Sequence, residues 1–186
     1  MSTTPRILAF AGSARRESLN RKLLAAVVEE VRTAGGEVTL LDLNDYPLPL
    51  YHGDEEDRHG LPSGAQALIE LITGHPALLI ATPEYNSMFT PLLKNTIDWC
   101  TRGDDNPFVG RVAAVVSASP GQFGGIRSMT VLRQLLTHLG CLVIPAQCVL
   151  PRADQALDDA GRLREERARK AARAVAEQLV RMTSIL

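Results

Sequence analysis

The sequence predicts an α/β fold in which helices cover both faces of a five-stranded parallel sheet with the strand order 2-1-3-4-5. Short apolar segments alternate with longer segments whose apolar residues recur every three or four positions, as strands and helices do in such folds. The short segments are continuously apolar, which is typical of strands that are covered on both faces. Right-handed crossovers leave few strand orders, and 2-1-3-4-5 is the one we favour.

Four segments rich in Val, Ile, Leu and Ala are predicted to be buried strands: Arg6–Ala11, Val38–Leu43, Ala77–Ala81 and Val112–Ala118. A fifth strand is expected within Cys141–Leu150. Pro145 lies in the middle of this segment and should end or bend the strand, because proline cannot donate a hydrogen bond to a neighbouring strand.

Helical spacing marks the segments between the strands. Leu19, Leu23, Val27 and Val31 recur every four residues, and the glycine pair Gly35–Gly36 should end this helix. Two similar stripes consist of Met129, Leu132, Leu136 and Leu139, followed by Gly140, and of Ala172, Val175, Leu179 and Met182 in the tail. Weaker patterns predict helices over Ser63–Thr73 and Pro91–Trp99.

The length of 186 residues suits one domain, 1–186, and the hydrophobic content of 45% is typical of globular proteins. Twenty basic and 21 acidic residues nearly cancel, so no strong field favours nucleic acid or a membrane surface. No segment reads as a signal peptide or a membrane span, and we expect a cytoplasmic protein. The three cysteines form no C-x-x-C pair, and the four histidines lack the spacing of metal ligands. We therefore expect neither a disulfide framework nor a zinc site.

Asn44–Pro62 is the one long segment that is predicted to be irregular. Its acidic run, Asp54–Asp57, lacks the spaced oxygen ligands and the glycine of a calcium loop. We interpret the segment as a solvated loop. The apolar residues of Leu48–Tyr51 leave open the alternative that it is an arm contacting a neighbouring subunit.

Three unusual loops follow strands 1, 3 and 4, and they should meet at one edge of the sheet, where ligands bind in folds of this kind. The first, Gly12–Asn20, leads into a helix N-terminus, which attracts anions. Ser13 and Ser18 can donate hydroxyls and Asn20 an amide. Arg15 adds a full charge, so a phosphate is the predicted ligand, although Ser18 alone could simply cap the helix. Neither a Walker loop nor a G-x-G-x-x-G fingerprint is present.

The second loop contains Pro83, which fixes the chain just after strand 3. Glu84, Tyr85 and Asn86 then form a turn that can offer backbone groups to a flat heterocycle, with Tyr85 as a wall. The alternative is an ordinary turn with a surface tyrosine.

The third loop, Ser117–Ser128, is rich in glycine. Gly121, Gly124 and Gly125 allow a positive φ or a close approach to a ligand, while Ser119 and Pro120 shape the rim. The alternative is a flexible connection. One phosphate loop and two loops at the edge of a heterocycle describe a mononucleotide with a large planar base, and FMN fits this description. For ATP we find neither a triphosphate cradle nor acidic magnesium ligands.

Taken together, the three motifs resemble the NADPH-dependent FMN reductase family, flavodoxin-like enzymes that include bacterial quinone and chromate reductases. The matching stretches are GSARRESLN at Gly12–Asn20, PEYN at Pro83–Asn86 followed by LKNTIDW at Leu93–Trp99, and SPGQFGG at Ser119–Gly125 followed by Arg127. The resemblance covers nearly the whole chain. The chain departs from the family at Met88, where many relatives carry a serine. The resemblance therefore does not define the shape of the pocket that receives the electron acceptor.

The resemblance implies a flavodoxin-like three-layer sandwich, bound FMN, NADPH or NADH as co-substrate, and a homodimer or homotetramer. It also implies three groups of binding residues: Ser13, Arg15, Ser18 and Asn20 at the FMN phosphate, Pro83, Glu84, Tyr85 and Asn86 at the flavin edge, and Ser119, Pro120, Gly121 and Gly124 under the pyrimidine side of the ring.

The expected reaction passes a hydride from nicotinamide through FMN to a quinone, flavin, azo compound or chromate in a ping-pong sequence. No catalytic side chain is required, because the cofactor carries the chemistry. We expect backbone N–H groups of the Tyr85–Ser87 and Ser119–Gly121 turns to bond to the ring. The alternatives are a flavodoxin-like electron carrier, which the net charge of −1 disfavours, and a regulatory protein without nicotinamide activity.

Overall fold

The computed structural model describes residues 4–158 and 160–185 and contains the predicted parallel sheet, in the order β2-β1-β3-β4-β5. The three central strands, β1 (Arg6–Ala11), β3 (Ala77–Ala81) and β4 (Val112–Ala118), begin and end at the predicted residues. Apart from Arg6, every residue in them is buried. Their continuous apolar character therefore reflects two covered faces, as the sequence indicated.

The edge strands differ from the prediction. β2 (Glu37–Leu41) ends two residues early, because Asp42 caps a short 3-10 helix, η1 (Leu43–Asp45), by accepting a hydrogen bond from the N–H of Asn44 at 3.1 Å. The predicted fifth strand is two short strands, β5 (Leu142–Val143) and β6 (Cys148–Leu150), which pair with the beginning and the end of β4.

Pro145 lies in the gap between β5 and β6, where the sequence placed an interruption. Next to it, the N–H of Ala146 donates to the side chain of Gln178 at 2.8 Å instead of to a strand. The interruption therefore leaves this backbone donor paired, since a helix from another part of the chain supplies the acceptor.

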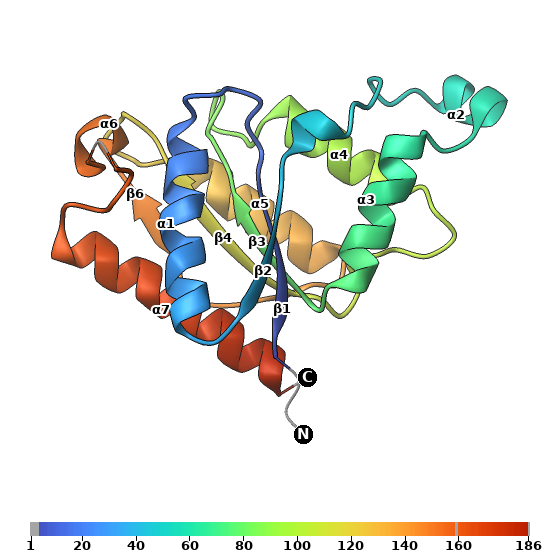
Figure 1. Cartoon of the computed structure of the whole chain (residues 1–186). Coiled ribbons are helices and arrows are strands. Elements are labelled where there is room, and N and C mark those ends of the chain that lie inside the picture. The colour runs from blue at the N-terminus through green and yellow to red at the C-terminus, as the bar shows by residue number, and fades with distance from the viewer. Residues whose placement is uncertain (1–3, 159, 186) are drawn as a thin grey trace.

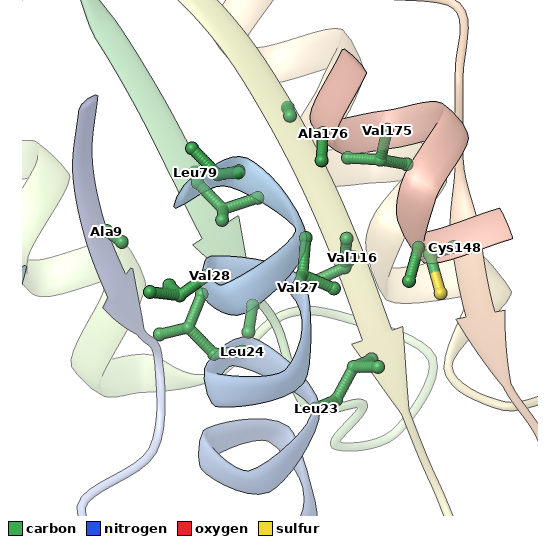
Figure 2. Packing of buried hydrophobic residues seen from close by; sticks show 14 of the residues in the cluster. Ala9, Leu23, Leu24, Val27, Val28, Leu79, Val116, Cys148, Val175 and Ala176 are labelled. Atoms are coloured by element: carbon green, nitrogen blue, oxygen red, sulfur yellow. The ribbon is translucent and has the colours of Figure 1, made fainter. Parts of the chain in front are cut away.

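Helices cover both faces of the sheet, as Figure 1 shows: α1 (Leu19–Thr33) and α7 (Glu166–Ser184) on one face, and α3 (Ser63–Gly74), α4 (Pro91–Cys100) and α5 (Ile126–His138) on the other. Figure 2 shows Leu23 and Val27 of α1 among the buried side chains of the sheet and Val175 of α7. Burying each such side chain contributes about 1.5–3 kcal/mol. The predicted apolar stripes are thus the inner faces of these helices.

The prediction that Asn44–Pro62 is irregular is wrong in part, because it contains η1 and a second helix, α2 (Gly53–His59). No side chain of α2 is buried, and the helix projects from the body of the molecule (Figure 1). Acidic residues in its first turn and basic residues in its last turn complement the helix dipole. A further short helix, α6 (Ala153–Ala156), was also not predicted.

The loops after β1, β3 and β4 leave the same edge of the sheet, at the top of Figure 1. The N–H of Gly12 donates to the carbonyl of Ala81 at 2.9 Å, and the N–H of Thr82 donates to the carbonyl of Val116 at 2.9 Å.

In the described part of the chain, no helix is both long and apolar enough to cross a membrane.

The glycine-rich loop between β4 and α5 packs closely on β6. Gly124 has φ +59°, and a Cβ atom there would lie 2.6 Å from Cγ1 of Val149 and 2.7 Å from the nitrogen of Pro151. This position therefore requires glycine for packing against its own chain. Gly121 lies at the exposed end of the same loop, and a Cβ atom there would meet only the hydroxyl of Ser119, at 3.4 Å.

We expect Gly124→Ala to lower the free energy of unfolding by roughly 2–4 kcal/mol, because it combines a strained φ with steric overlap. Gly121→Ala is the matched control and should change it by less than about 0.5 kcal/mol. Urea denaturation followed by circular dichroism measures both values. Equal stability of the two variants would contradict the packing role of Gly124.

Candidate functional site

One pocket of about 100 Å³ lies where the three loops meet. Nine of the twelve residues predicted for the site line it: Ser13, Arg15, Ser18, Asn20, Pro83, Glu84, Tyr85, Ser119 and Pro120. Asn86, Gly121 and Gly124 lie outside its lining. The structure thus brings together residues from the ends of β1, β3 and β4, as the sequence predicted.

Two buried hydroxyls stand at the end of the pocket formed by the first loop. The Ser13 oxygen accepts a hydrogen bond from the N–H of Arg15, and the Ser18 oxygen accepts one from the N–H of Arg21, each at 3.4 Å. Ser18 is the N-cap of α1. Since both oxygens act as acceptors within the chain, both O–H groups remain available to donate to an anion.

The charge around these hydroxyls is positive. Arg15 is exposed, lines the pocket and forms no ion pair with any residue in 4–158 or 160–185. The N-terminus of α1 adds amide N–H groups that have no partner within the helix, together with the positive end of the helix dipole. Hydroxyls, a guanidinium and a helix N-terminus form a donor set suited to a phosphate monoester.

Asn20 has a structural task that the sequence did not reveal. Its side-chain amide donates to the carbonyl of Ala118 at 2.9 Å, and its side-chain oxygen accepts from the N–H of Ala118 at 2.9 Å. These two bonds join the first turn of α1 to the end of β4. One N–H of the amide remains for a ligand.

The second loop forms a tight two-residue turn. Asn86 and Ser87 have φ of +51° and +67°, and paired backbone hydrogen bonds of 2.9 and 3.0 Å link Tyr85 and Met88 on either side. The N–H of Tyr85 is used in this pairing. The backbone N–H groups of Tyr85, Asn86 and Ser87 were expected to donate to the flavin ring. Those of Asn86 and Ser87 remain for this purpose.

The Ser119–Gly121 turn, whose amides were expected to bond to the ring, uses them within the chain. The N–H of Ser119 donates to the carbonyl of Leu150 at 3.2 Å, and the N–H of Gly121 donates to the Ser119 hydroxyl oxygen at 3.1 Å. Pro120 has no N–H. Among Ser119, Pro120 and Gly121, the hydroxyl proton of Ser119 is the donor that remains for a ligand.

Two further contacts hold the first loop, and the sequence analysis did not identify them. Thr90, the N-cap of α4, donates its hydroxyl to the carbonyl of Gly12 at 2.6 Å. The side chain of Asn44 bonds to Asp42 at 3.0 Å and to the carbonyl of Ala14 at 3.4 Å. A threonine before Pro91 is a recognisable capping signal, whereas no local pattern marks Asn44.

Asp42 is ionised in this network. Burial alone would raise its pKa, but hydrogen bonds from Asn44 and from the guanidinium of Arg21 outweigh burial and hold the pKa below its usual value. The carboxylate therefore ties α1 to the end of β2 at the base of the first loop.

The cysteines supply no reactive thiolate at neutral pH. Burial raises the pKa of Cys100, Cys141 and Cys148 to about 12. Within residues 4–158 and 160–185, no group of three or more His, Cys, Asp or Glu side chains is placed to hold a metal ion.

A larger cavity of about 830 Å³ lies on the outer side of α1, beside α6 and the start of α7. Small apolar side chains such as Ala25 and Ala26 line it, and charged residues at its rim pair with each other, as Arg162 does with Asp158. Among the described residues, this cavity has no cluster of hydrogen-bond donors that are available to a ligand. The smaller pocket is therefore the better candidate for the functional site.

The smaller pocket fits one end of FMN. The donors of the first loop line one end of this pocket and suit a group of phosphate size. A ring attached to a phosphate there could extend toward the second and third loops, which also line the pocket and carry the half-exposed side chain of Tyr85. The donor set and the rim match a phosphate monoester joined to a planar ring.

The comparisons with known proteins agree with this geometry. The model of the NADPH-dependent FMN reductase family matches residues 5–155. An NAD(P)H-dependent FMN reductase of Pseudomonas aeruginosa is 34% identical over 171 residues, which is 91% of this chain and 90% of that protein. A quinone reductase of Escherichia coli K12 is 34% identical over 144 residues, covering 77% of this chain and 76% of that protein.

Solved structures agree as well. FerB, a flavoenzyme NAD(P)H:(acceptor) oxidoreductase from Paracoccus denitrificans, superimposes with a TM-score of 0.83 at 27% identity over 98% of both chains. An archaeal flavodoxin has a TM-score of 0.61 at 5% identity over 96% of this chain and 98% of that one, which is a likeness of fold alone. Since the family model matches residues 5–155, most of the chain, and the relatives agree over most of their lengths, the chain belongs to the NADPH-dependent FMN reductase family.

Proposed function

We propose that this protein is an FMN-dependent NAD(P)H oxidoreductase that reduces a quinone or a similar planar acceptor. The observation that carries the proposal is the pocket in which Ser13, Ser18 and Arg15 surround the N-terminus of α1, beside two loops that can border a ring. We also propose that residues 1–186 act as one domain. Two relatives are named NAD(P)H-dependent FMN reductase and quinone reductase, which supports the choice of cofactor and acceptor.

In this proposal the residues hold the phosphate of FMN and orient its ring. The hydroxyls of Ser13 and Ser18, together with Arg15, hold the phosphate and so fix one end of the cofactor. The amides of Asn86 and Ser87 and the hydroxyl of Ser119 orient the ring edge and favour negative charge there by donating hydrogen bonds. Bound FMN would supply the redox chemistry, carrying a hydride from NAD(P)H to a quinone, which would become a hydroquinone by taking a proton from solvent.

The rim favours an apolar acceptor. Tyr85 is 48% exposed, Met88 is 47% exposed and Phe123 is 64% exposed, and all three come from the second and third loops. Tyr85 lines the pocket and Met88 pairs with it across the turn. Exposed apolar side chains beside a pocket favour contact with a planar apolar molecule over a hydrated oxyanion. We therefore place quinones first, with azo compounds, flavins and chromate as competing acceptors.

We further propose that the protein works in the cytoplasm as a homodimer or homotetramer. Its three cysteines are free, as in reducing compartments. The arm before α2 supports self-association, because Leu50 is 82% exposed while its neighbour Pro49 is fixed by hydrogen bonds from Trp99 at 2.8 Å and Asn95 at 2.9 Å. A fixed, exposed apolar projection is typical of a contact surface.

Analytical ultracentrifugation of the purified protein should therefore give a mass of two or four chains of 20.2 kDa. A monomer at micromolar concentration would contradict the proposed assembly and would leave the proposed reaction unaffected.

The reaction itself is tested with purified protein loaded with FMN and mixed with NADPH without oxygen. We expect the yellow flavin absorption to bleach within a catalytic time and to return when a quinone is added. Chromate, an azo dye and free flavin, supplied in parallel, rank the acceptors. Bound FMN that neither NADPH nor NADH bleaches would contradict the proposal and favour an electron carrier.

We expect Arg15→Ala to weaken FMN binding roughly ten- to hundredfold, because a hydrogen bond to a charged group contributes about 1.5–3 kcal/mol. Fluorescence titration measures the affinity. Riboflavin, which lacks the phosphate, should bind the parent protein and Arg15→Ala with equal affinity. Arg16→Ala is the matched control, since Arg16 is also exposed but does not line the pocket. Unchanged FMN affinity in Arg15→Ala would contradict the assigned phosphate site.

A further inference from the structure

Glu84 lies in the second loop and lines the pocket, and its carboxylate bonds to the start of α5. One carboxylate oxygen accepts from the N–H of Arg127 at 3.2 Å and from the N–H of Ser128 at 3.4 Å. The other accepts from Nε of Arg127 at 2.7 Å and also contacts its terminal guanidinium nitrogen. Only 8% of the Glu84 side chain is exposed. Four donors from one short segment therefore meet a single buried carboxylate.

The two backbone donors belong to the second and third residues of α5, the positions that an N-cap side chain normally satisfies. The N-cap residue is Gly125, which has φ +87° and no side chain. A larger residue would be strained there, both by this φ and because a Cβ atom would lie 3.0 Å from Cβ of Ser117. The cap of α5 is therefore supplied by a residue 43 positions earlier.

The contact continues into the third loop. The Arg127 guanidinium lies 5.2 Å from the centre of the Phe123 ring, within the range of a cation–π interaction. Phe123 belongs to the loop that carries Ser119 and Pro120, which line the pocket. On the other side, Glu84 directly precedes the turn of Tyr85–Met88. Glu84 is thus bonded to one loop of the site through its side chain and is part of the other through its backbone.

We propose that Glu84 is a positioning residue, whose carboxylate fixes the turn after β3 against the loop after β4 and so sets how tightly the site binds flavin. This inference rests on the proposed function, and it replaces direct cofactor binding by the Glu84 side chain. The negative charge matters as well as the shape, because it faces a helix N-terminus and a guanidinium.

The first measurement uses the protein without ligand. Hydrogen–deuterium exchange should be faster in Glu84→Ala than in the parent, both at residues 85–88 and at residues 119–128. Glu84→Gln keeps the shape and one acceptor oxygen, so it should show an intermediate change. Glu30→Ala is the control, because it removes another ion pair, with Arg173, that joins α1 to α7. Unchanged exchange at both loops in Glu84→Ala would overturn the proposal.

The second measurement is FMN affinity at a temperature where urea denaturation shows every variant to be folded. Glu84→Ala should weaken binding by about tenfold, the effect of a change of about 1.4 kcal/mol, with Glu84→Gln between it and the parent. Glu30→Ala should bind as the parent does. Faster exchange in Glu84→Ala with FMN affinity within twofold of the parent would overturn the proposal, since Glu84 would then only stabilise the fold.

A combination of variants separates the two ends of the site. The losses of FMN affinity in Glu84→Ala and Arg15→Ala should add, because the residues act on different loops, whereas Glu84→Ala and Arg127→Ala should not add. If the parent binds no FMN, the proposed function fails on its own, and the exchange data still decide whether Glu84 joins the two loops.

Discussion

The alignment of three strand ends is the constraint on which the rest of the molecule depends. Ala11 of β1 lies beside Ala81 of β3, which lies beside Val116 of β4, so the three loops start from one edge. A slip of one residue in β3 would turn its apolar side chains to the opposite face, where the helices do not fit them. Packing of the two helical layers therefore fixes the register, and the register places the site.

Within the site, polar groups divide into those that hold the loops and those that remain for a ligand. The hydroxyl of Thr90 and the side chain of Asn20 bond to backbone groups of other elements, at Gly12 and Ala118. Ser13 and Ser18 accept hydrogen bonds from their own loop and keep their protons. Because Thr90 and Asn20 hold the loops in place, Ser13 and Ser18 can donate to a ligand without a rearrangement of the site. Such preorganisation favours ligand binding and the stabilisation of charge.

Two of the three non-glycine residues with a positive φ in the described part of the chain lie in the turn of Tyr85–Met88. Asn86 and Ser87 both adopt left-handed conformations, which cost an ordinary residue about 1–2 kcal/mol each. The backbone pairing of Tyr85 with Met88 on either side supports the turn. Strain of this kind persists where the surroundings determine the conformation, and it is often found at functional sites.

The sequence by itself determined the strand order, the bounds of β1, β3 and β4, and the meeting of three loops at one edge, because burial and helical period are written in local patterns. It did not reveal α2 or α6, which are too short to show a period. Only the tertiary structure revealed the contacts of Asn20 and Glu84, whose partners lie 98 and 43 positions away. Hydrogen bonds between distant segments depend on where folding brings the chain, and no local pattern records that.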